Sequence, residues 1–161
     1  MHPRVKDLKA RLDTLIDNAE YHADPSDLPV LREAVANFKL AGPELLDEAT
    51  EPLFAYYRTI HDCFSAEERA EYDFPKIARP EDVWDHVEFN HPPHLDTGDG
   101  EYSPARSYID FEGGVSWEIE HGLELVIEEG VRVCRVGPYD GHLTNAHAFA
   151  ALSLLGVIYR G

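Results

Sequence analysis

Cysteine and basic residues are both scarce in this chain of 161 residues. The two cysteines, Cys63 and Cys134, lie far apart and show no C-x-x-C or zinc-type spacing, which argues against a disulfide framework and a structural zinc site. We expect both to be reduced thiols. Only 14 lysines and arginines accompany 31 aspartates and glutamates, which gives a net charge of −17. Such a chain repels nucleic acid and anionic membranes and favours basic proteins or cations as partners, or simply solubility.

Long apolar runs and the common catalytic motifs are absent too. No stretch approaches the roughly 18 apolar residues of a membrane-spanning helix, and the start of the chain, MHPRVKDLKARLD, lacks the apolar core of a signal peptide. We therefore expect a soluble, unexported, cytoplasmic protein. The chain contains no nucleophile elbow, P-loop, dinucleotide fingerprint or H-E-x-x-H. The common enzyme classes lose their support, and no cofactor is predicted, although a divalent metal stays open.

What is present predicts one globular domain over residues 1–161, because the length suits one domain and 43% of the residues are hydrophobic. Residues 1–88 are predicted to be mainly helical, since apolar residues recur there at helical spacing. The expected helices lie at residues 5–20, from Ser26 to the Gly42-Pro43 break, at 44–64 with a kink or a division at Pro52, after Ser65 and after Pro80. Proline, glycine, aspartate and histidine dominate residues 89–104, which predicts a loop.

A β-meander is predicted for residues 105–136. Triplets that end in glycine recur every eight residues, at 112–114, 120–122 and 128–130, and each reads as a three-residue hairpin loop. The four antiparallel strands then span 107–111, 115–119, 123–127 and 131–135. This register places the pairs Phe111–Val115, Ile109–Trp117, Ile119–Leu123, Trp117–Leu125 and Ile127–Val131 on one face. At the third loop a two-residue turn, which would pair Glu124 with Arg135, remains open.

The end of the chain is expected to close the core. Residues 145–158 are apolar nearly all round and predict a buried C-terminal helix, with a short edge strand as the alternative for its β-branched end. The predicted fold class is therefore α+β: N-terminal helices pack on one face of a four-stranded antiparallel meander, and a C-terminal helix completes the core.

The stretch SWEIEHGLEL, residues 116–125, has the residue types of a catalytic or metal-binding cluster. In the predicted register Glu120 and His121 lie in a hairpin loop, while Glu118 and Glu124 oppose each other on the second face of the sheet. Opposed carboxylates repel unless a cation, an arginine or a proton intervenes, so a metal site or a general base is one interpretation. The simpler one is a well-made turn beside an open sheet face on which Arg132 compensates the acids.

Two further clusters carry the same residue types. Asp140 and His142, with His147 nearby, could act as acid–base groups or ligands on a loop that leads into a helix, although Asp-Gly is equally an ordinary turn. The three histidines His86, His91 and His94 lack a standard zinc spacing. The acidic stretch 96–107 does not fit an EF-hand, because its acids fall at the wrong offsets.

The motif Trp117-Glu118-Ile119-Glu120-His121-Gly122-Leu123 resembles the Trp-Asp/Glu-x-Glu-His-Gly-Leu signature of a bacterial family of domains of unknown function. The Gly130 turn and the segment 136–142 extend the resemblance over about residues 105–143. It implies a small cytosolic bacterial α+β protein and carries over no activity and no catalytic residue. Some related small acidic proteins look like immunity partners of bacterial toxins.

Three hypotheses remain. The first is a non-enzymatic acidic module that binds a basic protein, in the manner of an immunity protein or inhibitor. The second is a metal-dependent or acid–base enzyme; its catalytic candidates are Glu118, Glu120, His121, Asp140 and His142, and its metal-ligand candidates are Glu118, Glu124, Asp140 and His142. The third is a homodimer joined through the open sheet face.

Overall fold

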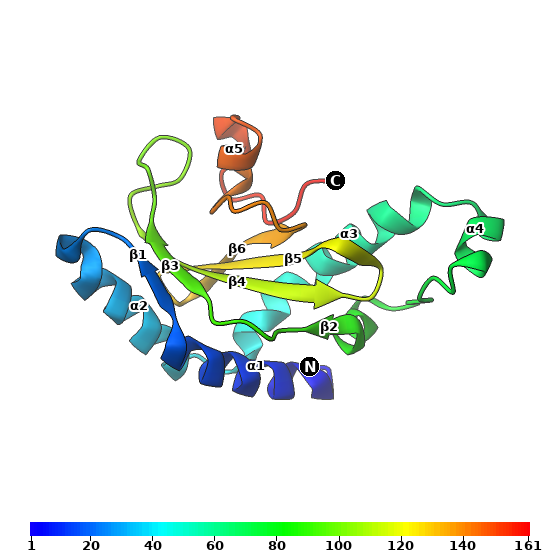
Figure 1. Ribbon diagram of the computed structural model, residues 1–161, viewed down its shortest axis with the longest axis horizontal. Coiled ribbons are helices and arrows are strands. Elements are labelled where there is room, and N and C mark those ends of the chain that lie inside the picture. Colours follow the sequence, from blue (N-terminus) through cyan, green and yellow to red (C-terminus); the bar gives the residue numbers. More distant parts are fainter.

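Helices fill most of the first half of the chain and strands most of the second in the computed structural model, which describes residues 1–161 (Figure 1). The α-helices are α1 (Pro3–Leu15), α2 (Leu28–Leu40), α3 (Thr50–Asp62), α4 (Ala66–Glu71) and α5 (Asn145–Ala148). The strands are β1 (Glu20–His22), β2 (Val87–Glu88), β3 (His94–Thr97), β4 (Ser107–Val115), β5 (Glu118–Glu128) and β6 (Arg132–Gly137). Short 3-10 helices span Ile16–Asn18, Pro25–Asp27, Pro43–Ala49, Pro80–His86 and Leu152–Leu154. The predicted α+β class is confirmed, and none of the helices has the length and apolar composition to cross a membrane.

Proline and serine set helix boundaries in the first half. The predicted helix at residues 44–64 is divided near Pro52 rather than kinked: a 3-10 helix ends at Ala49, and α3 begins at Thr50. Pro52 thus lies in the first turn of α3, where its missing N–H costs no intrahelical hydrogen bond. Ser65 caps α4 as predicted, because its hydroxyl accepts the backbone N–H of Glu68 while the carboxylate of Glu68 accepts the N–H of Ser65.

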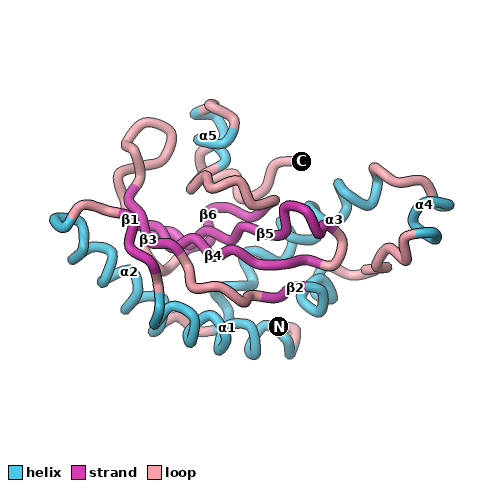
Figure 2. Tube along the Cα trace, viewed as in Figure 1, coloured by secondary structure: helices cyan, strands magenta, loops and turns pink.

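All six strands belong to one mixed sheet with the order β1-β3-β4-β5-β6, and β2 pairs with β4 (Figure 2). β1 and β3 run parallel, and the other pairs are antiparallel. The prediction of a four-stranded antiparallel meander is therefore wrong in detail. Residues 89–104, expected to be a loop, contribute β3, and residues 1–88, expected to be mainly helical, contribute β1 and β2.

The antiparallel meander consists of the three strands β4, β5 and β6. The hairpin loops predicted at 112–114 and 120–122 do not form. β4 continues through its glycines to Val115, and the chain turns at Ser116 and Trp117 into β5. Phe111 pairs with Leu125 rather than Val115, and Ile109 pairs with Ile127 rather than Trp117. The third loop does form, one residue later than predicted: Glu129 and Gly130 both have positive φ, and Glu128 pairs with Arg132.

Close backbone contacts account for Gly113 and Gly122 where no hairpin loop forms, and Gly122 also has the left-handed φ, 65°, that favours glycine. A Cβ on Gly113 would lie 2.8 Å from the carbonyl oxygen of Glu88 in β2, and a Cβ on Gly122 would overlap the carbonyl oxygen of Gly113. Residues 119–122 form a bulge, because the pairing of β4 with β5 jumps from Val115–Glu118 to Gly113–Leu123. The bulge turns Ile119 into solvent, where it is 89% exposed, against the prediction that it faces the core.

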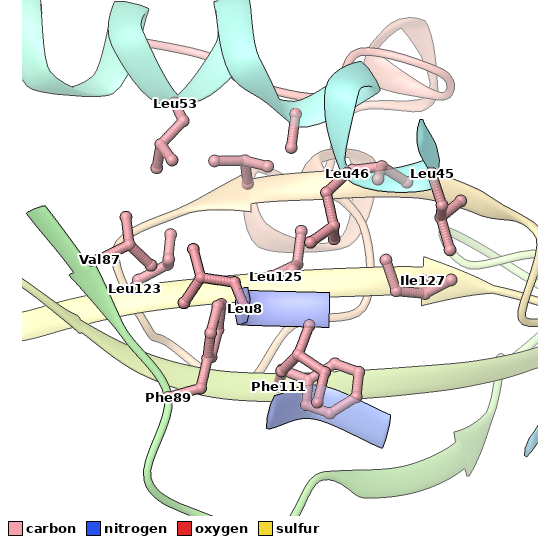
Figure 3. Packing of buried hydrophobic residues seen from close by; sticks show 14 of the residues in the cluster. Leu8, Leu45, Leu46, Leu53, Val87, Phe89, Phe111, Leu123, Leu125 and Ile127 are labelled. Atoms are coloured by element: carbon pink, nitrogen blue, oxygen red, sulfur yellow. The ribbon is translucent and has the colours of Figure 1, made fainter. Parts of the chain in front are cut away.

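The helices cover one face of the sheet and enclose the core. Leu45, Leu46 and Leu53, from the 3-10 helix and α3, point toward Leu123, Leu125 and Ile127 of β5 (Figure 3). They belong to one cluster of 29 buried residues that draws on both halves of the chain, and the predicted burial of Trp117 is confirmed. The packing of N-terminal helices on one sheet face follows the prediction.

α5 lies on the other side of the sheet, as Figure 1 shows, and the chain end returns past β6 to α3, where Tyr159 packs beside Tyr56. The predicted helix at 145–158 is wrong: only Asn145–Ala148 is α-helical, and φ is positive at Ala150 and Gly156. The last residues instead supply an acceptor to β6, since the N–H of Val136 donates to the carbonyl oxygen of Ile158 over 2.8 Å. β6 is the edge strand of the sheet, and this hydrogen bond gives one of its N–H groups an acceptor. The predicted C-terminal helix would not have provided one.

Candidate functional site

The sheet face opposite the helices carries buried polar side chains. Asp110 of β4, Glu124 of β5 and Arg135 of β6 are at most 5% exposed. A β-bulge between β5 and β6 turns two consecutive residues, Cys134 and Arg135, toward this face, while Val133 and Val136 join the core. Leu143 packs from above on Tyr108, Val126 and Cys134. This face is therefore largely covered and is not the open, solvated surface that was expected.

Arg135 binds the polar groups of this face together. Its guanidinium donates to both carboxylate oxygens of Asp140, over 2.6 and 2.7 Å, and to Glu124. It also donates to the carbonyl oxygen of His142 and to Asn145 Oδ1. Burial alone would raise the pKa of Asp140, but hydrogen bonds and charge from Arg135 lower it to about 2. Arg135, and not Arg132 as predicted, compensates the acids here; Arg132 binds Glu128 instead.

Asp110 and Glu124 form a buried carboxyl pair. Burial raises the pKa of both groups, and the negative charge of Asp110 raises that of Glu124 further despite Arg135. One oxygen of each, Asp110 Oδ1 and Glu124 Oε1, is buried without a hydrogen-bond partner. A shared proton would relieve the repulsion between them, and the raised pKa of both groups leads us to expect one proton on the pair at neutral pH.

The shared proton predicts that stability falls as pH rises. Folding raises the pKa of both carboxyls, so the folded state holds more protons than the unfolded chain above the ordinary carboxyl range. The free energy of unfolding then decreases with increasing pH, by up to about 1.4 kcal/mol per pH unit for one proton. Urea unfolding between about pH 5 and pH 8 measures this slope.

Asp110→Asn should flatten the slope, because the amide can donate to Glu124 without a titrating proton. The matched control is Glu120→Gln on β5, where the carboxylate is exposed, and this variant should retain the wild-type slope. Parallel profiles for Asp110→Asn and wild type would contradict the shared proton.

Glu118 organises the bulge of residues 119–122. Its carboxylate accepts the backbone N–H groups of Glu120 and His121 over 3.0 and 2.8 Å. The hydroxyl of Tyr56 on α3 lies 3.4 Å from Glu118 Oε2 and donates to the carbonyl oxygen of Gly122 over 2.9 Å. In the stretch SWEIEHGLEL, the carboxylate of Glu118 is therefore occupied by hydrogen bonds from backbone N–H groups of the same stretch.

The predicted site residues fall into two groups. Glu118, Glu120 and His121 offer ligand atoms within 4.8 Å of one another at the bulge. Glu124, Asp140 and His142 gather around Arg135, and His142 Nδ1 lies 2.9 Å from Asp140 Oδ1. Glu118 and Glu124 do not oppose each other as predicted, because Glu118 pairs with Val115 and Glu124 with Glu112. A backbone hydrogen bond links the segments that carry the two groups, because the N–H of Tyr139 donates to the carbonyl oxygen of His121.

The sequence of this chain matches the model of one protein family, described as a domain of unknown function (DUF6985), over residues 8–143. The chain belongs to this family. The comparison agrees with the resemblance to an uncharacterised domain, whereas the bacterial origin and the signature motif stay predictions. Neither the curated proteins nor the solved structures contain a match.

The part that matches the DUF6985 family includes functional candidates that sequence reasoning missed. Arg135 entered the sequence analysis only as a possible strand partner of Glu124, and its role as the cation for these acids was assigned to Arg132. Glu20 and His22 were assigned to a helical region, although their i, i+2 spacing places both on one face of a strand. His94 was grouped with His86 and His91, but it lies beside Glu20 across the β1–β3 pair.

Proposed function

We propose that this protein is a non-enzymatic binding module that docks a basic, partly apolar segment of another protein in a groove beside α2. Two adjoining hollows support the proposal, because both are lined by Asn37 of α2 and by Val131 of the β5–β6 turn. The larger measures about 670 Å³. We call the two together the α2 groove.

Exposed apolar side chains line the α2 groove. Leu40 at the end of α2 is 86% exposed, and Val131 and Val30 are about half exposed. A single exposed apolar residue is ordinary, but three along one groove with a polar rim are typical of a protein-binding surface. They provide the apolar contacts that a docked segment needs.

Acidic side chains form the rim of the α2 groove. They are Asp27, Glu33, Glu44, Glu48 and Glu129. The one base in the lining, Arg106, donates to Glu128 over 2.6 Å and is therefore neutralised. A groove of this charge attracts lysine- and arginine-rich segments and speeds their association. Inhibition of a basic partner, as by an immunity protein, is one form that such a function takes.

The acid–base enzyme and the homodimer gain less support. Glu118 and Asp140 use their oxygens on internal donors, and Glu124 is fully buried. A homodimer through the second sheet face would compete with the segment around Leu143, which already packs there.

A basic amphipathic peptide of lysine and leucine tests the proposal by NMR titration of the labelled protein. We expect shifts in α2 and in the turn 129–131, with an affinity that falls steeply from about 0.05 M to about 0.3 M salt, because exposed charges are screened. The charge reversals Glu33→Lys and Glu129→Lys should each weaken binding about tenfold.

The control is Glu67→Lys on α4, where an exposed acid lies outside the groove. Shifts spread evenly over the acidic surface, or an equal loss of binding in the control, would contradict the α2 groove as the docking site.

A further inference from the structure

We propose that Glu20, His22 and His94 form a binding site for a divalent transition-metal ion of the zinc class at the β1–β3 edge of the sheet. The inference is independent of the α2 groove, because none of the three residues lines it. We call the three residues the edge triad.

Strand pairing brings the edge triad together. β1 lies parallel to β3 with Glu20 directly beside His94, and Glu20 and His22 lie on the same side of β1, two residues apart. The N–H of Glu20 donates to the carbonyl oxygen of Pro93 over 2.9 Å, which holds the start of β1 against β3. Residues 72 positions apart in the sequence thus present their side chains on one face.

The spacing of the ligand atoms matches a coordination shell. His22 Nε2 and His94 Nδ1 lie 3.0 Å apart, and Glu20 Oε2 lies 3.6 and 3.5 Å from these two nitrogens. Tetrahedral ligands at about 2.0–2.1 Å from a zinc ion are about 3.3–3.4 Å from one another. The three atoms therefore form nearly one face of such a tetrahedron, and shifts of a few tenths of an ångström complete it.

The ring orientation also suits a metal. The planes of the two imidazoles cross at 76° with centroids 4.8 Å apart, and a nitrogen of each ring lies at the contact between them. Only one proton fits between nitrogens at 3.0 Å, so at least one of them already presents a lone pair. A metal ion replaces that proton and receives both lone pairs together with the carboxylate oxygen.

Exposure and charge decide which ion fits. The side chains of Glu20 and His22 are more than half exposed and that of His94 is about one-third exposed, so an ion reaches the site from solvent and keeps a water as its fourth ligand. Two imidazoles favour zinc, nickel or copper over magnesium or calcium. Asp110 pairs with His94 on the neighbouring strand, so a further carboxyl group lies on the strand next to the site.

The other ligand-type cluster fits a metal less well. Glu118 beside Glu120 and His121 already accepts two backbone N–H groups and contacts the hydroxyl of Tyr56. In the edge triad no backbone donor to Glu20 Oε2 competes for the ion, and the ion would join β1, a strand of three exposed residues, to β3. The predicted consequence of binding is a more stable edge of the sheet.

Calorimetric titration of the full chain with Zn²⁺ at about pH 7.5 tests the proposal, because metal binding requires histidine ligands without a proton on the binding nitrogen. We expect one bound equivalent in the wild type. His22→Ala and His94→Ala should each weaken binding by about 100-fold or more, because even a residue that only supports a metal ligand contributes about 10–100-fold.

Two matched controls separate this site from other histidines. His91→Ala removes an exposed histidine three residues before His94, and His121→Ala removes the histidine of the bulge; both should bind like the wild type. Paramagnetic broadening by Co²⁺ locates the ion in the unmodified chain, and we expect it at residues 20–22 and 94. The absence of wild-type binding at millimolar Zn²⁺, broadening centred on residues 118–121, or unchanged binding in His22→Ala and His94→Ala would overturn the proposal.

Discussion

Arg135→Met should lower the free energy of unfolding by about 3–5 kcal/mol, because it leaves buried acids without their cation. Arg135 is 2% exposed and is the basic side chain that contacts Glu124, which is fully buried. Methionine keeps much of the volume of the arginine stem, so the loss reports mainly on charge and hydrogen bonds. Denaturant unfolding at neutral pH measures it.

Arg132→Met on the same strand is the matched control. Arg132 is about half exposed, and its acceptor Glu128 retains a second donor, Arg106, so a much smaller loss is expected. Combining Arg135→Met with Glu124→Gln should recover part of the stability. The single variant leaves the buried Glu124 carboxyl without its cation, and the double variant replaces that carboxyl with a neutral amide. Equal losses for Arg135→Met and Arg132→Met would contradict the central role given to Arg135.

Gly130→Ala should strongly lower the free energy of unfolding, because both the backbone conformation and the packing at this position require glycine. Gly130 has a φ of +76°, and a Cβ there would overlap the carbonyl oxygen of Ala34 and lie 2.8 Å from the backbone nitrogen of Phe38. Left-handed strain costs about 1–2 kcal/mol, and forcing extra atoms into a packed site costs about 1–3 kcal/mol more. We therefore expect a total loss of about 3 kcal/mol, measured by thermal or denaturant unfolding.

Gly141→Ala separates the two contributions. Gly141 has nearly the same φ, +78°, but a Cβ there would meet nothing within 4 Å. This variant should lose only the strain of about 1–2 kcal/mol. The difference between the variants then measures how tightly the β5–β6 turn packs on α2, which is also the wall of the α2 groove. A loss in Gly130→Ala no larger than in Gly141→Ala would show that the turn can move away from the helix.

Local patterns predicted much of the helical half. Ser65 with Glu68, and apolar residues at helical spacing before Gly42, depend on interactions within a few residues, so sequence reasoning finds them. Regularly spaced glycines misled the reading of the sheet. A glycine required for a turn and one required for contact with another strand look the same in a sequence, and only Gly130 and its neighbour form a turn.

The candidate sites depended on pairings that no local pattern reveals. A three-residue strand such as β1 is too short to show a periodicity, so the meeting of Glu20 and His22 with His94 could not be foreseen. The bulge that turns Arg135 away from the core likewise follows from how β5 and β6 pair. Glu124, Asp140 and His142 were identified by residue type alone, and the arginine that unites them was not.

By itself, the sequence determined the α+β class, the acidic surface, the Ser65 cap and the burial of residues such as Trp117, because these follow from composition and from contacts close along the chain. Only the tertiary structure decided the strand order, the register of β4 on β5, the cation at the centre of the buried acids and the edge triad. Those features join residues from tens of positions apart, and their energies come from packing and from the removal of charges from water, which depend on what the rest of the fold brings near.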